Sequence, residues 1–111
     1  GLLSLVQETR NVEANDRIFD YITTLAEATR THPLVELGVS PRGALALCRM
    51  AKAHAFLAGR DFVVPEDVAS VFPDVCAHRL ILSAKARMME EKAENILAEI
   101  LKSVDMPVLK A

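Results

Sequence analysis

The sequence predicts an all-α domain, a small bundle of four to six helices with room for one short extended segment. The 111 residues are 51% hydrophobic, but only 5% are aromatic and there is no Trp. Such a mainly aliphatic composition suits closely packed helices better than an aromatic-rich sheet. Apolar residues also recur at spacings of three and four, and Pro and Gly stand at the expected helix ends. We therefore expect one domain over residues 1–111, with residues 105–111 as a loose tail.

The first two helices are expected over residues 2–10 and 16–30. Asn15 is a plausible N-cap for the second, because its side chain can accept a backbone N–H of the first turn. Pro33 ends that helix, since the residue before a proline is driven out of the helical region. Residues 32–39 then form an apolar loop. The buried stripe of the second helix is expected to comprise Ile18, Phe19, Ile22, Leu25, Ala26 and Thr29.

The most buried helix is expected over residues 41–58. Ser40 and Pro41 provide an N-cap followed by proline at the first helical position, and Gly59 is the C-terminal stop. Small side chains along one face let a partner helix approach closely. These are Ala44, Cys48, Ala51, Ala55 and Ala58.

The C-terminal half predicts two more helices. One begins at Pro65 after an extended link over residues 60–64, and its first turn carries two acids, where the helix dipole favours them. Pro73 is expected to end it, with residues 74–78 adding one turn, and residues 80–82 could be extended. The last helix is expected over residues 89–104, with one apolar face made of Ala93, Ile96, Leu97, Ile100 and Leu101.

Charge and cysteine content exclude several classes of protein. There are 13 Lys and Arg against 15 Asp and Glu, with a formal net charge of −2. A nucleic-acid interface normally shows a clustered basic face, so none is expected. No apolar stretch reaches the length of a membrane span, and no signal peptide is apparent. Cys48 and Cys76 cannot form a disulfide framework, so we expect buried free thiols in a reducing compartment.

No self-contained active site is expected. His32, His54 and His78 are scattered and lack the paired spacing of zinc ligands, so each is assigned a structural or solvent-exposed role and no metal is predicted. No Ser, Cys and His combination has the context of a nucleophile elbow. The chain starts at Gly1 rather than Met. That start suggests a piece cut from a longer polypeptide.

Residues 38–43 form the segment of greatest interest. The glycine spacing imitates a phosphate-binding loop, but Ala44 and Leu45 stand where a Lys and a Ser or Thr are required. Arg42 lies in the first turn of a helix, which already carries partial positive charge. That placement becomes favourable if an anion docks there, because backbone amides, the dipole and a guanidinium would then converge on it. The residues alone leave open that Arg42 simply reaches solvent or a nearby carboxylate.

Several motifs in register resemble the C-terminal lid domain of MoxR-family AAA+ ATPases. The similarity covers residues 14–107. The motifs are Gly38-Val39-Ser40-Pro41-Arg42-Gly43-Ala44, Ala51-Lys52-Ala53-His54-Ala55 and the run from Gly59 to Val68, together with Asp20-Tyr21-Ile22, Thr29-Arg30-Thr31-His32-Pro33 and Val75-Cys76-Ala77-His78-Arg79-Leu80.

The resemblance implies a lid that follows an ATP-binding domain in a cytoplasmic, chaperone-like ATPase. Arg42 would be the sensor-2 arginine that reaches the γ-phosphate of ATP, and Ser40, Pro41 and Gly43 would shape the helix start. The full-length protein would use ATP and Mg²⁺, and this arginine would serve hydrolysis. This chain has no Walker A lysine, Walker B acids or arginine finger, so the fragment alone is expected to be inactive. Implied partners are the upstream ATPase core, neighbouring subunits of a hexameric ring and a client protein.

Two departures from the family pattern are modest. Val39 replaces a small residue, and Val64 replaces a Thr or Ser N-cap, a loss of about 1 kcal/mol. Arg30 and Arg79 lie in family-like motifs without an assigned contact, so surface or interface pairing is expected of them. The alternative hypothesis is a stand-alone helical interaction module that binds no nucleotide.

Overall fold

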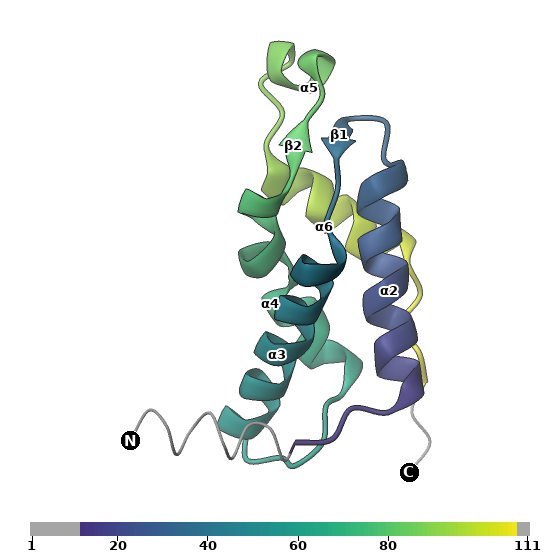
Figure 1. The fold of residues 1–111 in the computed structure, drawn as a ribbon, viewed down its shortest axis with the longest axis vertical. Helices are drawn as coiled ribbons and strands as arrows, with labels where there is room; N and C mark the ends of the chain where they lie inside the picture. The colour runs from purple at the N-terminus through teal and green to yellow at the C-terminus, as the bar shows by residue number, and fades with distance from the viewer. Residues whose placement is uncertain (1–11, 109–111) are drawn as a thin grey trace.

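Helices dominate the computed structural model, which describes residues 12–108 (Figure 1). In this part of the chain the α-helices are α2 (Asp16–Thr31), α3 (Pro41–Leu57), α4 (Pro65–Cys76), α5 (Ala84–Met88) and α6 (Ala93–Ser103). A short 3₁₀ turn, η1 (Ala77–Arg79), and two strands, β1 (Val35–Leu37) and β2 (Ile81–Leu82), complete it. The predicted helical bundle with a short extended segment is therefore confirmed. The helix expected over residues 2–10 lies outside the described residues.

Helix α2 begins and ends close to where the sequence predicts. The Asn15 side chain accepts a hydrogen bond from the Ile18 N–H at 3.1 Å, which caps the first turn. One member of the predicted stripe is wrong: Phe19 is 44% exposed, whereas Tyr21 is only 3% exposed. The stripe runs through Ile18, Tyr21 and Ile22 in successive turns, so Phe19 falls at its edge.

Helix α3 is the central helix, and it packs chiefly against α4. The Ser40 hydroxyl accepts from the Gly43 N–H at 3.1 Å, and Gly59 has φ of 82°, the left-handed conformation that ends many helices. The small residues Cys48, Ala51 and Ala55 are buried on one face. Their size allows α4 to approach closely.

An apolar loop was expected over residues 32–39, and this is wrong for part of the segment. Its residues 35–37 form β1, which pairs antiparallel with β2 through Val35 opposite Leu82 and Leu37 opposite Ile81. The extended character of residues 80–82 was expected, but no local pattern specified a partner strand so far away in the chain. Together with α5, the two strands form one end of the molecule (Figure 1).

Two helix boundaries in the C-terminal half differ from prediction. Helix α4 continues through Pro73 to Cys76, although an interior proline removes one backbone hydrogen bond. Phe72 and Cys76, on either side of Pro73 along the chain, are fully buried, so packing of this face outweighs the lost bond. The expected helix over residues 89–104 begins only at Ala93. Glu90, with φ of 57°, follows the separate helix α5.

The segment before α2 is tied to the link between α3 and α4. The Glu13 N–H donates to the Asp61 carbonyl at 2.9 Å, and the Val63 N–H donates to the Glu13 carbonyl at 2.8 Å. Val12 and Val63 are buried in the same core. The chain therefore enters the bundle beside the extended link that leads into α4.

Both cysteines are free and buried in the core. Burial raises the pKa of the Cys48 thiol, and it raises that of Cys76 to about 11 although Arg79 acts in the opposite direction. The buried free thiols expected from the sequence are therefore confirmed. None of the helices in residues 12–108 is long and apolar enough to cross a membrane.

Candidate functional site

Arg42 lies in the first turn of α3, and its side chain is exposed. Within residues 12–108 it forms no side-chain hydrogen bond and no ion pair. Of the two alternatives left open by the sequence, pairing of Arg42 with a nearby carboxylate has no support in the described residues, whereas the side chain does reach solvent. The first backbone N–H groups of a helix also lack partners within it. An exposed guanidinium and the positive end of α3 thus lie together at this end of the helix.

The start of α3 is shaped by the three residues that the sequence singled out beside Arg42. Ser40 caps the helix, Pro41 occupies its first position with a fixed φ, and Gly43 is buried. A Cβ on Gly43 would lie 2.8 Å from Cγ1 of Val39, which is itself fully buried. Any larger residue at position 43 would therefore displace Val39.

Val39 is held by hydrogen bonds from both of its own backbone polar groups. Its N–H donates to Oγ1 of Thr29 at 2.9 Å, and its carbonyl accepts from Nε of Arg30 at 2.8 Å. Thr29 is fully buried, and its hydroxyl donates in turn to the Ala26 carbonyl at 2.6 Å. The end of α2 is thus joined to the residue three positions before Arg42. We call these two bonds to Val39 the Val39 clamp.

A pocket of about 370 Å³ opens beside the clamp. Two of its lining residues are arginines and none is acidic: Arg30, Leu37, Gly38, Val39, Ser40 and Arg79. Nε of Arg79 donates to the Val75 carbonyl at 3.1 Å. In the described residues Arg30 and Arg79 thus use Nε on backbone carbonyls and form no ion pair with a carboxylate.

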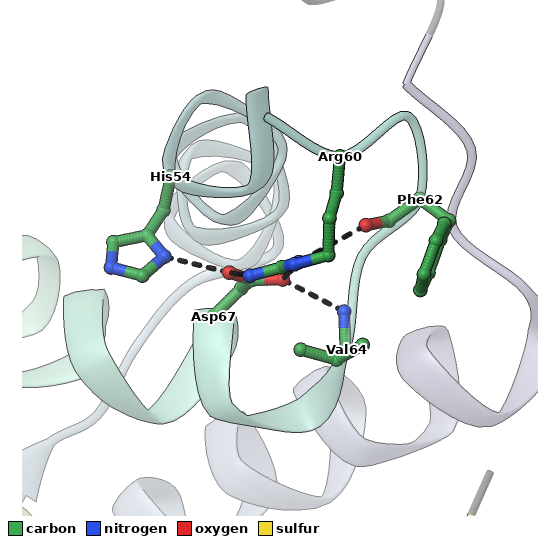
Figure 2. A network of polar contacts seen from close by, with 5 residues as sticks. All are labelled: His54, Arg60, Phe62, Val64 and Asp67. Atoms are coloured by element: carbon green, nitrogen blue, oxygen red, sulfur yellow. Dashed lines mark hydrogen bonds and ion pairs between the residues drawn. The ribbon is translucent and has the colours of Figure 1, made fainter. Parts of the chain in front are cut away.

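A second polar cluster surrounds Asp67 in the first turn of α4 (Figure 2). The fully buried carboxylate accepts from Nη1 and Nη2 of Arg60 at 2.6 and 2.8 Å and from the Val64 N–H at 2.8 Å. Nδ1 of His54 lies 2.6 Å from Oδ1 and donates its proton, because an ionised carboxylate can only accept. The Asp67 cluster joins α3, the link after it and α4.

Burial and hydrogen bonding shift the pKa of Asp67 in opposite directions. Burial of the carboxylate raises its pKa, but the hydrogen bonds from Arg60, the Val64 N–H and His54 outweigh burial and hold the pKa of Asp67 below its usual range. The sequence indicated Asp67 only as an acid near a helix dipole. The sequence did contain a signal for this role. An acid three residues after an N-cap residue, as Asp67 is after Val64, can accept a hydrogen bond from the N-cap N–H.

The three histidines do not converge on one site. Nδ1 of His32 accepts from the Leu34 N–H at 3.1 Å, His54 belongs to the Asp67 cluster, and His78 is exposed. Within residues 12–108, no group of three or more His, Cys, Asp or Glu residues could hold a metal ion.

Comparison with known proteins agrees with the family-like motifs. Residues 27–100 match the AAA lid domain family. The chain is 42% identical over 107 residues to protein YeaC of Bacillus subtilis, covering 96% of the chain and 33% of that protein. It is 33% identical over 119 residues to the chaperone MoxR1 of Mycobacterium tuberculosis, covering 99% and 32%. It thus spans about a third of the length of these relatives.

A solved structure shares the fold. A crystal structure from Cytophaga hutchinsonii, of a protein assigned as an ATPase, superimposes with a TM-score of 0.87 at 32% identity. The match covers 92% of this chain and 34% of the other. The similarity therefore concerns one domain of a larger protein in this case as well.

Proposed function

Because this chain belongs to the AAA lid domain family, as a lid of the MoxR type, we propose that it serves as the lid of a longer ATPase and contributes Arg42 to the nucleotide site. The ATPase core would hold ATP and Mg²⁺. This lid would couple the nucleotide state to chaperone-like remodelling of a client protein. A hexameric ring and a cytoplasmic location, both expected from the family resemblance, belong to the same proposal.

The observation that carries the proposal is the exposed Arg42 at the N-terminal end of α3. A cation is unfavourable beside the positive end of a helix, unless an anion is bound there. A phosphate would meet both the guanidinium and the N-terminal amides of α3, which are suited to anions. Arg42 would bind the γ-phosphate and stabilise the charge that develops on it during phosphoryl transfer.

The fold suits a lid that moves as one body. The Val39 clamp joins α2 to α3, and the Asp67 cluster joins α3 to α4. A change at Arg42 would therefore be passed to the whole bundle rather than to one helix. The similarity to proteins three times as long also favours a lid over a stand-alone interaction module.

The isolated chain is proposed to be inactive. One arginine and one helix end do not replace a phosphate-binding loop and a Mg²⁺ site, so its affinity for ATP should be weak. Measurable ATP hydrolysis by the purified 111-residue chain would contradict this part of the proposal.

The direct test is Arg42→Ala in the full-length protein. We expect ATP turnover to fall at least about tenfold, which corresponds to about 1.4 kcal/mol of transition-state stabilisation. Arg49→Ala is a matched control, because Arg49 is also an exposed arginine of α3, two turns further along. Turnover that is unchanged by Arg42→Ala, or lowered equally by both variants, would remove Arg42 from the mechanism.

A further inference from the structure

We propose that Thr29 and Arg30 are positioning residues for Arg42. They hold the backbone of Val39 and thereby set the start of α3, from which Arg42 projects. The inference rests on the proposed role of Arg42. It also gives Arg30, which the sequence left without a contact, a specific task.

The clamp acts on both polar groups of one residue. The Val39 N–H donates to Thr29 Oγ1 at 2.9 Å, and Arg30 Nε donates to the Val39 carbonyl at 2.8 Å. Thr29 and Val39 are both fully buried, so water does not compete for the bond between them. The peptide groups on either side of Val39 are therefore fixed relative to the last turn of α2.

Little freedom remains between the clamp and Arg42. Ser40 is held by its capping bond to Gly43, and the ring of Pro41 fixes its own φ. The Val39 side chain packs against Gly43, where even a Cβ would approach to 2.8 Å. A shift of Val39 therefore moves the backbone from which the Arg42 side chain extends. Displacements of about 1 Å in a reacting group are enough to reduce rates substantially.

Gly38 brings the two segments close enough for these bonds. A Cβ at this position would lie 2.7 Å from the backbone N and Cα of Arg30. The chain before α3 thus passes directly over the end of α2. This contact and the two hydrogen bonds place the Thr-Arg pair of one motif against the Gly-Val-Ser-Pro-Arg run of the other.

A clamp that only stabilises the fold and a clamp that positions Arg42 predict different effects on kcat when the clamp is removed. If Thr29 only stabilises the fold, its loss lowers the unfolding temperature, while the folded protein turns over ATP at the normal kcat. If Thr29 positions Arg42, its loss lowers kcat only while Arg42 is present. A double-mutant cycle separates these cases.

The experiment measures kcat and KM for ATP in the full-length protein. We expect Thr29→Val to lower kcat about three- to tenfold with KM within about twofold, a range set by the modest geometric change. Thr29→Ser, which keeps the hydroxyl, should restore kcat. In an Arg42→Ala background, Thr29→Val should change kcat by less than about 1.5-fold, because the group it positions is gone. Thr24→Val is the control, since in the described residues the Thr24 hydroxyl donates to the Asp20 carbonyl of its own helix and takes no part in the Val39 clamp.

Arg30→Met supplies a second variant should Thr29→Val fail to fold. Arg30 is exposed, and methionine has no N–H donor, so the substitution removes the bond to the Val39 carbonyl. Its effect should likewise disappear with Arg42→Ala. Normal kcat in both folded clamp variants, while Arg42→Ala alone is slow, would overturn the positioning role and leave the proposed function intact. Effects that multiply in the double variants would overturn it as well. If Arg42→Ala itself were neutral, both proposals would fail.

Discussion

The carboxylate of Asp67 is fully buried and accepts two hydrogen bonds from the guanidinium of Arg60, at 2.6 and 2.8 Å. This fork-to-fork pairing connects the link after α3 with the first turn of α4. The same carboxylate accepts from the Val64 N–H, so it supplies one of the two bonds of a capping box at the start of α4. One side chain thus closes the corner between the two most extensively packed helices.

The Asp67 cluster predicts a specific dependence of stability on pH. The pKa of Asp67 is lowered in the folded protein, so its contribution is complete above the unfolded pKa of about 3.9 and is lost as pH falls through the lower folded value. Asp67→Asn should lower the free energy of unfolding at pH 7 by about 1–3 kcal/mol, because hydrogen bonds to a charged group are lost. The deficit should shrink as the pH falls below about 4, because the carboxyl becomes neutral first in the unfolded chain and then, at its lower pKa, in the folded protein.

Urea unfolding of the wild type and the variant at pH 7 and across pH 2–4 checks this prediction. Asp74→Asn is the control, since Asp74 is exposed and lies outside the cluster. A deficit of the same size at every pH would mean that the charge of Asp67 contributes little.

Val64 offers a stabilising substitution. The Asp67 carboxylate accepts from the Val64 N–H, but Val64 has no side-chain acceptor for the amides of the first turn, so only half of a capping box forms. Val64→Thr keeps the shape and adds a hydroxyl. We expect the free energy of unfolding to rise by about 0.5–1 kcal/mol. Val75→Thr, the same exchange inside α4, should give no such gain when measured by thermal unfolding, and equal effects of the two substitutions would refute the capping explanation.

Local signals in the sequence predicted the parts of the fold that are determined locally. Asn15, Ser40 and Gly59 act within one turn of a helix, and each lies where it was expected. The pairing of β1 with β2 depends on residues far apart in the chain, and no pattern near Val35 revealed it. The continuation of α4 through Pro73 similarly depends on packing that the sequence does not display.

The candidate site likewise contains features that the sequence predicts and features that it does not. The residue type and the helix-start position of Arg42 could be predicted, because proline and serine mark that start. The Val39 clamp could not, since Thr29 and Val39 are ten residues apart and are brought together by the path of the segment between α2 and α3, which includes β1. The sharing of one carboxylate by His54 and Arg60 was equally hidden until α3 and α4 were placed together.

The buried hydroxyl of Tyr21 is expected to contribute little to the stability of the fold. Its side chain is buried, and the hydroxyl oxygen has no hydrogen-bond partner among the described residues. Tyr21→Phe removes that polar atom and keeps the ring. We expect the free energy of unfolding to stay unchanged or to rise by up to about 1 kcal/mol, because an unsatisfied polar group is no longer buried. Tyr21→Ala should cost about 3–5 kcal/mol through lost packing. A loss of more than about 1 kcal/mol in Tyr21→Phe would show that the hydroxyl has a partner.

Substitutions at two glycines distinguish an effect on the stability of the lid from an effect on its proposed role in ATP turnover. A Cβ at Gly38 would press on the backbone of Arg30 at 2.7 Å, whereas a Cβ at Gly59 would meet nothing within 4 Å but must adopt φ of 82°. Gly38→Ala should cost about 1–3 kcal/mol of unfolding free energy through overpacking. Gly59→Ala should cost about 1–2 kcal/mol through backbone strain alone. Only Gly38→Ala displaces the Val39 clamp, so only this variant should lower the kcat for ATP in the full-length protein.

Thermal unfolding and steady-state kinetics on the same preparations of the two glycine variants make the comparison direct. If the two measured stability losses are of similar size, as expected, a difference in kcat does not come from partial unfolding. Equal kcat values for Gly38→Ala and Gly59→Ala would mean that the approach of residue 38 to α2 serves folding alone. A slow Gly38→Ala beside a normal Gly59→Ala would tie the geometry at the end of α2 to the chemistry at Arg42.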